Sequence, residues 1–157
     1  MQTPCLSVIR SRIALATRPG SLRRSPAYHN TYFNVYTQGG IFLFIYRISG
    51  TFGKLQNQSL ELQDGLNILQ APNEAGKSTW CSLIAAMLFG INSRERDKAG
   101  FIAEKNRFAP WTGLSMSGRL DCRVGERELT LIRTTRRQTS PMGEFQAVYP
   151  GTGDPVP

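Results

Sequence analysis

The sequence predicts an α/β fold built on a mixed sheet with an added antiparallel hairpin. Three observations lead to this prediction. A short apolar stretch, 66–70, is followed by a glycine-containing loop, and the loop runs into apolar residues at helical spacing. Alternating stretches precede the loop, as neighbouring strands of a sheet would. Two more alternating stretches lie beyond the helix and are separated by Gly125-Glu126, a typical hairpin turn.

Two strands and two turns are predicted before the loop. Phe42 to Ser49 has the composition of a strand, Gly50 to Gly53 that of a turn, and Gln58 to Leu62 that of a second short strand. Asp64-Gly65 is a hairpin-type turn sequence. We therefore expect Leu66 to Gln70 to be the buried strand that leads into the loop.

The helix is expected to begin at Lys77 and to end at Gly90, because glycine is common just beyond helix ends. The apolar residues of this segment share one helical face: Trp80, Leu83, Ile84, Met87 and Leu88. Such a stripe indicates packing against a core and carries no chemistry of its own.

Basic residues are frequent beyond the helix. The polar stretch 91–106 predicts a solvated loop, and contact with nucleic-acid phosphates is the alternative for its basic residues and for Arg107. The hairpin is expected at 116–124 and 128–134, appended to the sheet. A solvated strand end explains the three arginines that close it, and contact with a polyanion is the alternative: Arg133, Arg136 and Arg137. The tail, 140–157, is rich in Gly, Pro and Thr and predicts a loop.

The loop between the predicted strand and helix has the pattern of a phosphate-binding loop, in which main-chain amides and a helix N-terminus face an anion. Gly76 lets the main chain approach phosphate oxygens. Lys77 supplies a positive charge to the β- and γ-phosphates, and the Ser78 hydroxyl is placed to bind Mg²⁺. Thr79 adds a donor in the first helical turn, at the positive end of the helix dipole.

One position departs from the G-x-x-x-x-G-K-[ST] pattern, because Ala71 stands where the first glycine is expected. Pro72 favours an extended conformation for the residue before it, and alanine adopts that conformation without strain. Lys77 is the candidate catalytic residue. The candidate nucleotide-binding residues are Ala71, Asn73, Glu74, Ala75, Gly76, Lys77, Ser78 and Thr79. The cofactors predicted are ATP and Mg²⁺, and the alternative is a chance match in a surface loop.

Length and charge indicate one folded domain with a basic extension. Of the formal charge of +8, residues 1–44 supply +5 from five arginines and no acid, so the remainder is mildly basic at +3. We expect a disordered basic extension at 1–40, a nucleotide-binding lobe at 41–150 and a truncated loop at 151–157. A mitochondrial transit peptide, or a region upstream of a misplaced start codon, are the alternatives for the extension.

The cysteines and the apolar runs bear on compartment. Three widely spaced cysteines favour a reducing environment, and we expect a cytoplasmic protein. The longest apolar run, 41–46, is far shorter than a membrane span, so no membrane partner is expected. The single histidine, His29, has no nearby cysteine pair and excludes an ordinary zinc site.

Over roughly residues 44–150 the chain resembles the N-terminal ATPase half of the SMC, RecF, RecN and SbcC type of ABC-like, AAA-family P-loop ATPases. The likeness is carried by the runs Ile48 to Leu55, Asp64 to Ile68, Pro72 to Thr79, Met87 to Gly90 and Arg107 to Trp111. It implies a P-loop NTPase fold, the ABC-type N-terminal lobe. It also implies a function: an ATP-binding lobe of an ATPase linked to DNA repair, including double-strand break processing, or to chromosome maintenance.

The resemblance further implies how such a lobe works. ATP joins two heads into a homodimer, DNA is a partner of the full-length protein, and a nuclease is a candidate partner. A C-terminal half supplies the Leu-Ser-Gly-Gly signature and the catalytic carboxylate, and this sequence contains neither. We therefore expect the chain alone to bind ATP without significant turnover. A small P-loop kinase and a non-catalytic nucleotide-binding fragment are the alternative functions.

Overall fold

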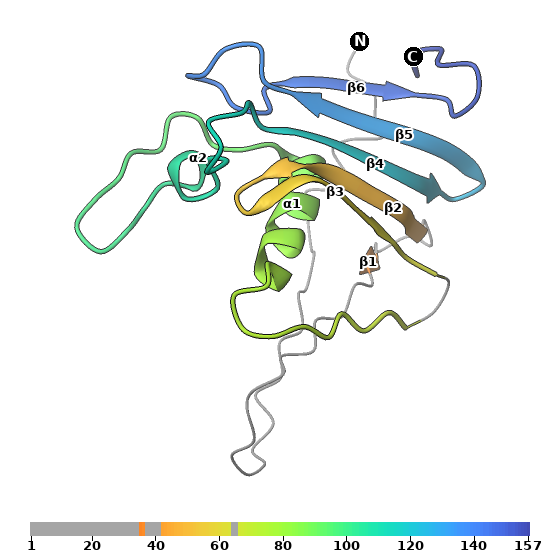
Figure 1. Ribbon diagram of the computed structural model, residues 1–157. Helices are drawn as coiled ribbons and strands as arrows, with labels where there is room; N and C mark the ends of the chain where they lie inside the picture. Colours follow the sequence, from red (N-terminus) through yellow and green to blue (C-terminus); the bar gives the residue numbers. More distant parts are fainter. Residues whose placement is uncertain (1–34, 37–41, 64–65) are drawn as a thin grey trace.

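One antiparallel sheet with a single long helix against one face makes up the computed structural model (Figure 1). The structure describes residues 35–36, 42–63 and 66–157. The strands are β1 (Val35–Tyr36), β2 (Phe42–Phe52), β3 (Leu55–Glu61), β4 (Ser117–Val124), β5 (Arg127–Thr134) and β6 (Glu144–Val148). The helices are α1 (Lys77–Phe89) and α2 (Glu104–Arg107).

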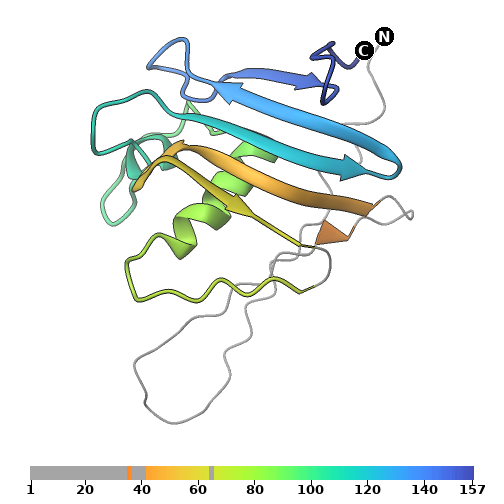
Figure 2. The same cartoon turned by 45° about the vertical axis from the view of Figure 1, so that its right-hand side comes forward.

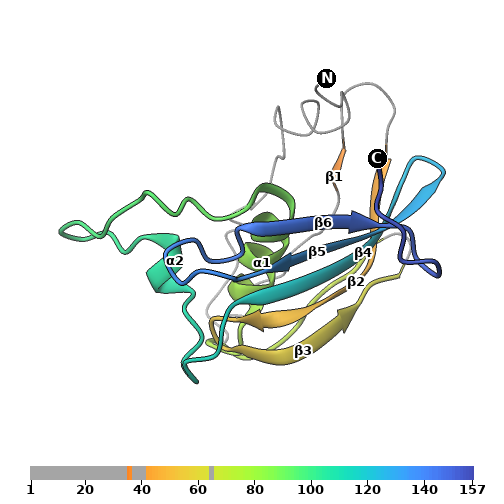
Figure 3. The same ribbon diagram turned by 90° about the horizontal axis from the view of Figure 1, so that it is seen from above.

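The strand order is β1-β2-β4-β5-β6, and β3 also pairs with β2. Every pairing among these strands is antiparallel, so the prediction of a mixed sheet is wrong for the described chain. The view from above shows the long strands side by side with α1 beneath them (Figure 3). The predicted hairpin is confirmed as β4 and β5, with a turn at Gly125-Glu126. It is not appended to the sheet, because β4 pairs with β2 along the whole of its length.

The predicted strand 66–70 is also wrong, since this segment has no strand assignment. Leu66 and Ile68 are 62% and 53% exposed, although Leu69 packs against the core. A strand is held by its ladder to a neighbour, and none of the described strands pairs with this segment. It passes beneath the sheet as an extended connection to the start of α1 (Figure 2).

Several elements begin or end at other residues than predicted, or were not predicted. The first strand continues through Gly50 to Phe52, and the turn before β3 lies at Gly53-Lys54. The predicted terminal loop contains β6, which pairs with β5. The polar stretch after α1 is mostly irregular, as predicted, although α2 begins at its end. Asp64-Gly65 and His29 lie outside the described residues, as does the expected extension apart from Val35–Tyr36, which form β1.

The core lies between α1 and the sheet. Leu83 and Met87 of α1 are fully buried against Ile48 of β2 and Leu120 of β4, which confirms the predicted helix and its apolar stripe. Gly118 allows this close approach, because a Cβ there would lie 2.5 Å from the Met87 sulfur. Gly90 ends the helix as expected, with its amide donating to the carbonyl of Ala86. The packing fixes where α1 begins, and therefore where the glycine-containing loop lies.

Candidate functional site

The loop before α1 is a tight bend whose backbone twice enters the left-handed region. Glu74 has φ 68° and Gly76 has φ 91°, and the amide of Ala75 donates to the carbonyl of Pro72 at 3.3 Å. Residues alternating between right- and left-handed conformations turn successive amides toward one side, which makes an anion-binding concavity. The helix dipole adds positive potential at the same place. The predicted bend is therefore present in the structure.

The amides of this bend are available to a ligand. Within the described part of the chain, no acceptor receives a hydrogen bond from the main-chain N–H groups of Asn73, Glu74, Gly76, Lys77, Ser78 and Thr79. Gly76, Lys77, Ser78 and Thr79 contribute the amides that any helix N-terminus leaves without an intrahelical acceptor, and those of Asn73 and Glu74 extend this run into the loop. An anion with several oxygen acceptors would satisfy this run, and phosphate oxygens fit that description.

Lys77 turns its side chain back over the loop. Its residue is only 8% exposed, and its Nζ donates to the carbonyl of Pro72 at 2.8 Å and to that of Ala71. No carboxylate among the described residues forms an ion pair with it. Because only neutral carbonyls contact this ammonium among the described residues, it can still form an ion pair with an incoming anion.

The other predicted residues divide into accessible and buried groups. Asn73, Glu74, Ala75 and Ser78 are exposed, so the Ser78 hydroxyl can reach a cation bound to phosphate. Thr79 is buried, and its methyl group faces Gly53 in the β2–β3 turn, so its amide is what it offers to the loop. Gly76 and Lys77 are buried at the helix start, and Ala71 contributes the carbonyl that accepts from Lys77.

Sequence reasoning missed Lys54. This residue lies in the turn after β2, yet its Nζ donates to the carbonyl of Glu74 at 3.2 Å and lies 4.0 Å from the Glu74 carboxylate. Twenty residues separate the two positions, and no spacing rule links a hairpin turn to a loop so far along the chain. The only signal was a lysine in a turn that precedes a phosphate-loop pattern.

Two of the basic residues weighed as nucleic-acid contacts have side-chain partners within the described chain. Lys105 donates to the carbonyl of Ser93 at 2.8 Å, and the Arg107 guanidinium lies over the Phe108 ring at 5.4 Å. Asp97 organises the stretch, because its carboxylate accepts from the Ala103 amide and the Asn106 side chain. These contacts describe a loop stabilised by its own side chains.

Arg133 is not a solvated strand end, which corrects that prediction. Its guanidinium donates to the carbonyl of Met87 at 2.9 Å and to that of Met142 at 3.2 Å, and it lies 4.5 Å from the centre of the Phe145 ring. Burial lowers the pKa of Arg133. Arg136, by contrast, is exposed and forms one ion pair with Glu144. Arg133 therefore joins the end of α1 to β5 and β6.

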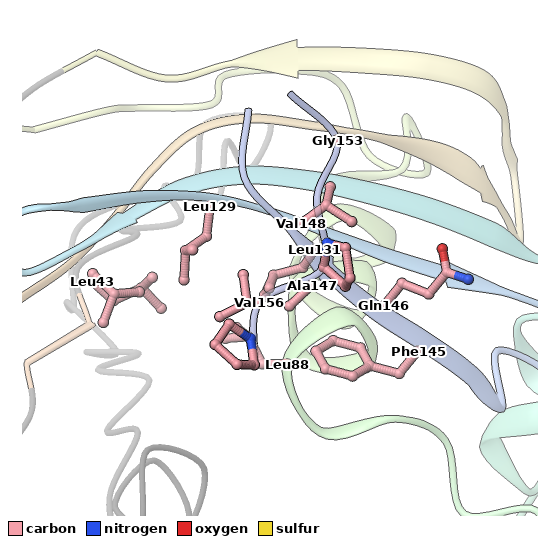
Figure 4. Close-up of a pocket in the computed structure, with 13 residues that line it drawn as sticks. Leu43, Leu88, Leu129, Leu131, Phe145, Gln146, Ala147, Val148, Gly153 and Val156 are labelled. Carbon is pink, nitrogen blue, oxygen red and sulfur yellow. The ribbon is translucent and has the colours of Figure 1, made fainter. Parts of the chain in front are cut away.

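A large apolar cavity of about 620 Å³ lies elsewhere, lined by Leu88 near the end of α1, by side chains of the sheet and by the C-terminal turn. Figure 4 shows Leu43, Leu129 and Leu131 around it, with Val156 of the C-terminal turn. Gln146 is the one polar side chain in its lining, and no charged group lines it. A phosphate needs amides and cations, so this cavity does not compete with the loop as the anion site.

Potential metal ligands are sparse among the described residues. No group of three or more His, Cys, Asp or Glu side chains there could hold a metal ion, so a divalent cation would need oxygens from a ligand as well as from Ser78. In the same part of the chain, no helix is long and apolar enough to cross a membrane.

A family model described as an AAA domain matches residues 49–151, which is more than half of the chain. The matched segment contains the whole loop, α1, the strands β3 to β6 and the last residues of β2. Neither curated proteins nor solved structures gave a match.

Proposed function

This chain belongs to the AAA domain family and is a nucleotide-binding module of AAA-family P-loop ATPases, and from that premise we propose that residues 71–79 bind Mg·ATP. The observation that supports this most strongly is the run of unpaired amides next to a buried, un-neutralised Lys77. In this proposal the amides of 73–79 hold the phosphate oxygens and Lys77 contacts the β- and γ-phosphates. The exposed Ser78 hydroxyl binds the Mg²⁺ that bridges those phosphates.

Bound Mg²⁺ would supply charge neutralisation to the phosphates, and the chain's own residues would supply position. Among the described residues, the carboxylate of Glu74 is the one acidic side chain paired with a group near the loop, and it is 88% exposed and directed to Lys54. Among the carboxylates that the structure describes, none is held by a partner at the loop where it could orient a water for attack on the γ-phosphate. We propose that turnover needs a carboxylate from another lobe, and that this chain alone binds ATP without appreciable hydrolysis.

The biological setting is proposed from the motif resemblance together with the family match. We propose an ATPase of the SMC and SbcC type, linked to DNA repair or chromosome maintenance in the cytoplasm. Its heads would pair through ATP, with DNA as partner of the full-length protein and a nuclease as a further candidate. ATP-dependent retention of duplex DNA by the full-length protein would support this setting. Phosphoryl transfer to a nucleotide or metabolite would instead favour a small kinase.

Calorimetric titration of Mg·ATP tests the binding proposal. Lys77→Ala should weaken affinity by about 100-fold, because a charged contact to phosphate contributes on the order of 3 kcal/mol. Lys105→Ala is the matched control, since its ammonium also donates to a main-chain carbonyl but lies outside the loop. Equal affinities of wild type and Lys77→Ala for Mg·ATP would overturn the binding proposal. Steady-state phosphate release by the pure chain would overturn the proposal that it does not hydrolyse ATP alone.

A further inference from the structure

An exposed tryptophan stands beside the phosphate loop. Trp111 is 74% exposed, so its indole ring is accessible to a ligand. It lies in the segment after α2, more than thirty residues beyond Lys77 in sequence. The structure nevertheless connects it to the loop through one side chain, that of Lys54.

Lys54 forms this connection. Its Nζ lies 5.0 Å from the centre of the Trp111 ring and 3.2 Å from the carbonyl oxygen of Glu74. The ring centre is therefore no more than about 8 Å from the loop. The ammonium covers one part of the ring, and the high exposure of the indole leaves most of the rest accessible.

The position of this segment is fixed by packing rather than by Lys54 alone. The Gly53 amide donates to the carbonyl of Phe108 at 2.8 Å, and the Phe108 ring stacks on Phe52 of β2 at 4.8 Å. Phe52 is 1% exposed, so the stack is anchored in the core. On the other side, Gly53 meets the methyl group of Thr79 at the start of α1. The β2–β3 turn thus lies between the phosphate loop and the segment that carries Trp111.

We propose that Trp111 and Lys54 form the subsite for the base of the nucleoside triphosphate whose phosphates bind at 71–79. The inference rests on the proposed nucleotide site and adds to it where the other end of the ligand lies. Every nucleobase has a flat face that stacks on an aromatic ring, and Trp offers the largest such surface. The phosphates bind at the start of α1, and the turn beside Thr79 leads from there to the indole. A nucleoside triphosphate is long enough to span that distance.

Lys54 has a second role in this arrangement. Its ammonium lies over the ring and brings a second positive charge to the loop, 4.0 Å from the exposed Glu74 carboxylate. Both ammoniums donate to carbonyls of the loop, Lys77 to Ala71 and Pro72 and Lys54 to Glu74. A polyphosphate bound at this loop would therefore lie near two ammonium groups.

The test compares Mg·ATP with Mg·tripolyphosphate, which has the charge and no base. Trp111→Ala should weaken Mg·ATP by about tenfold, in the range measured for loss of one base–aromatic stack. It should leave the affinity for Mg·tripolyphosphate unchanged, and Trp111→Phe should restore most of the loss. Leu114→Ala is the matched control, an exposed apolar residue of the same segment. Because Trp111 is exposed, these changes should not unfold the chain.

Fluorescence gives an independent measurement, because the other tryptophan, Trp80, is buried in the core. Mg·ATP should quench wild-type emission, Mg·tripolyphosphate should not, and Trp111→Phe should abolish the quenching. Equal loss of both ligands in Trp111→Ala, or no loss of either, would overturn the base subsite and leave the phosphate site standing. If Trp111→Ala lost affinity for a single-stranded oligonucleotide but kept its affinity for Mg·ATP, the base subsite would also be overturned. Failure of the wild type to bind either ligand would overturn the phosphate site and the subsite together.

Discussion

Two basic side chains of this protein make the same kind of contact and do different work. Lys77 and Arg133 are both withdrawn from solvent, and both donate to two main-chain carbonyls without a carboxylate partner. Around Lys77, a run of main-chain amides remains without acceptors. Around Arg133, the end of α1, the strands β5 and β6 and the Phe145 ring close the space.

The difference between these two regions separates a binding site from a structural junction. A cation that satisfies carbonyls in a closed environment stabilises the fold, because removing it leaves those carbonyls buried and unpaired. A cation beside unpaired amides remains available, because an anion can satisfy the amides and the ammonium at once. Burial and hydrogen bonding of the cation alone would not distinguish the two.

The largest effect is expected at the junction. Arg133→Ala should lower the free energy of unfolding by about 2–4 kcal/mol, since it removes two hydrogen bonds and the packing on Phe145. Affinity for Mg·ATP in the folded fraction should not change. Urea unfolding measures the loss, and Arg136→Ala, exposed and in one surface ion pair, should cost under about 1 kcal/mol. If Arg133→Ala were as stable as wild type, Arg133 would have no structural role that distinguishes it from Lys77.

Gly76 tests whether the shape of the loop matters apart from its charge. Its φ of 91° is strained for any residue with a Cβ, by about 1–2 kcal/mol, although space for a Cβ exists 3.6 Å from Leu55. Gly76→Ala should weaken Mg·ATP about tenfold as the bend relaxes. Gly113→Ala carries the same strain at φ 75° in open space and should leave binding unchanged. If both variants bind alike, the bend does not hold the phosphates.

A Ser78 variant tests whether the loop contacts the bound cation as well as the phosphates. Ser78→Ala should weaken binding of Mg·ATP by about tenfold, the loss of one ligand worth roughly 1–2 kcal/mol, and leave metal-free ATP unaffected. Stability should be unchanged because the side chain is exposed. Ser82→Ala, one turn further along α1, is the control. A loss that is the same with and without Mg²⁺ would mean that Ser78 contacts phosphate and not the cation.

The smallest effect near neutral pH is expected for Cys122, which is buried in the core of the sheet. Burial raises the pKa of Cys122 from 9.0 to about 12. The folded state therefore favours the protonated thiol, and the resulting stability is fully present below pH 9 and is lost as pH rises toward 12. The difference in unfolding free energy between wild type and Cys122→Val should be constant below about pH 8. Above pH 9 the unfolding free energy of the wild type should fall relative to that of Cys122→Val, by at most about 1.4 kcal/mol per pH unit. A constant difference to pH 11 would contradict the raised pKa.

Local patterns were enough to predict the helix, the hairpin and the loop. The stripe from Trp80 to Leu88 repeats at helical spacing, so α1 could be predicted from neighbours within two turns. The same holds for β4 and β5, whose turn and alternation are local features. The phosphate loop is local too, since Gly76, Lys77 and Ser78 are consecutive. In each case the interactions that define the element lie within one continuous stretch of fewer than twenty residues.

The tertiary structure alone decided which strands pair, and therefore what became of 66–70. An extended apolar segment becomes a strand only if a neighbour completes its ladder, and the described sheet offers it none. Pairing of β4 with β2 joins segments some seventy residues apart, which no local pattern specifies. The roles of Arg133, Lys54 and Trp111 likewise depend on long-range contacts. The sequence by itself determined the chemistry of the loop, and the packing of distant segments decided what surrounds it.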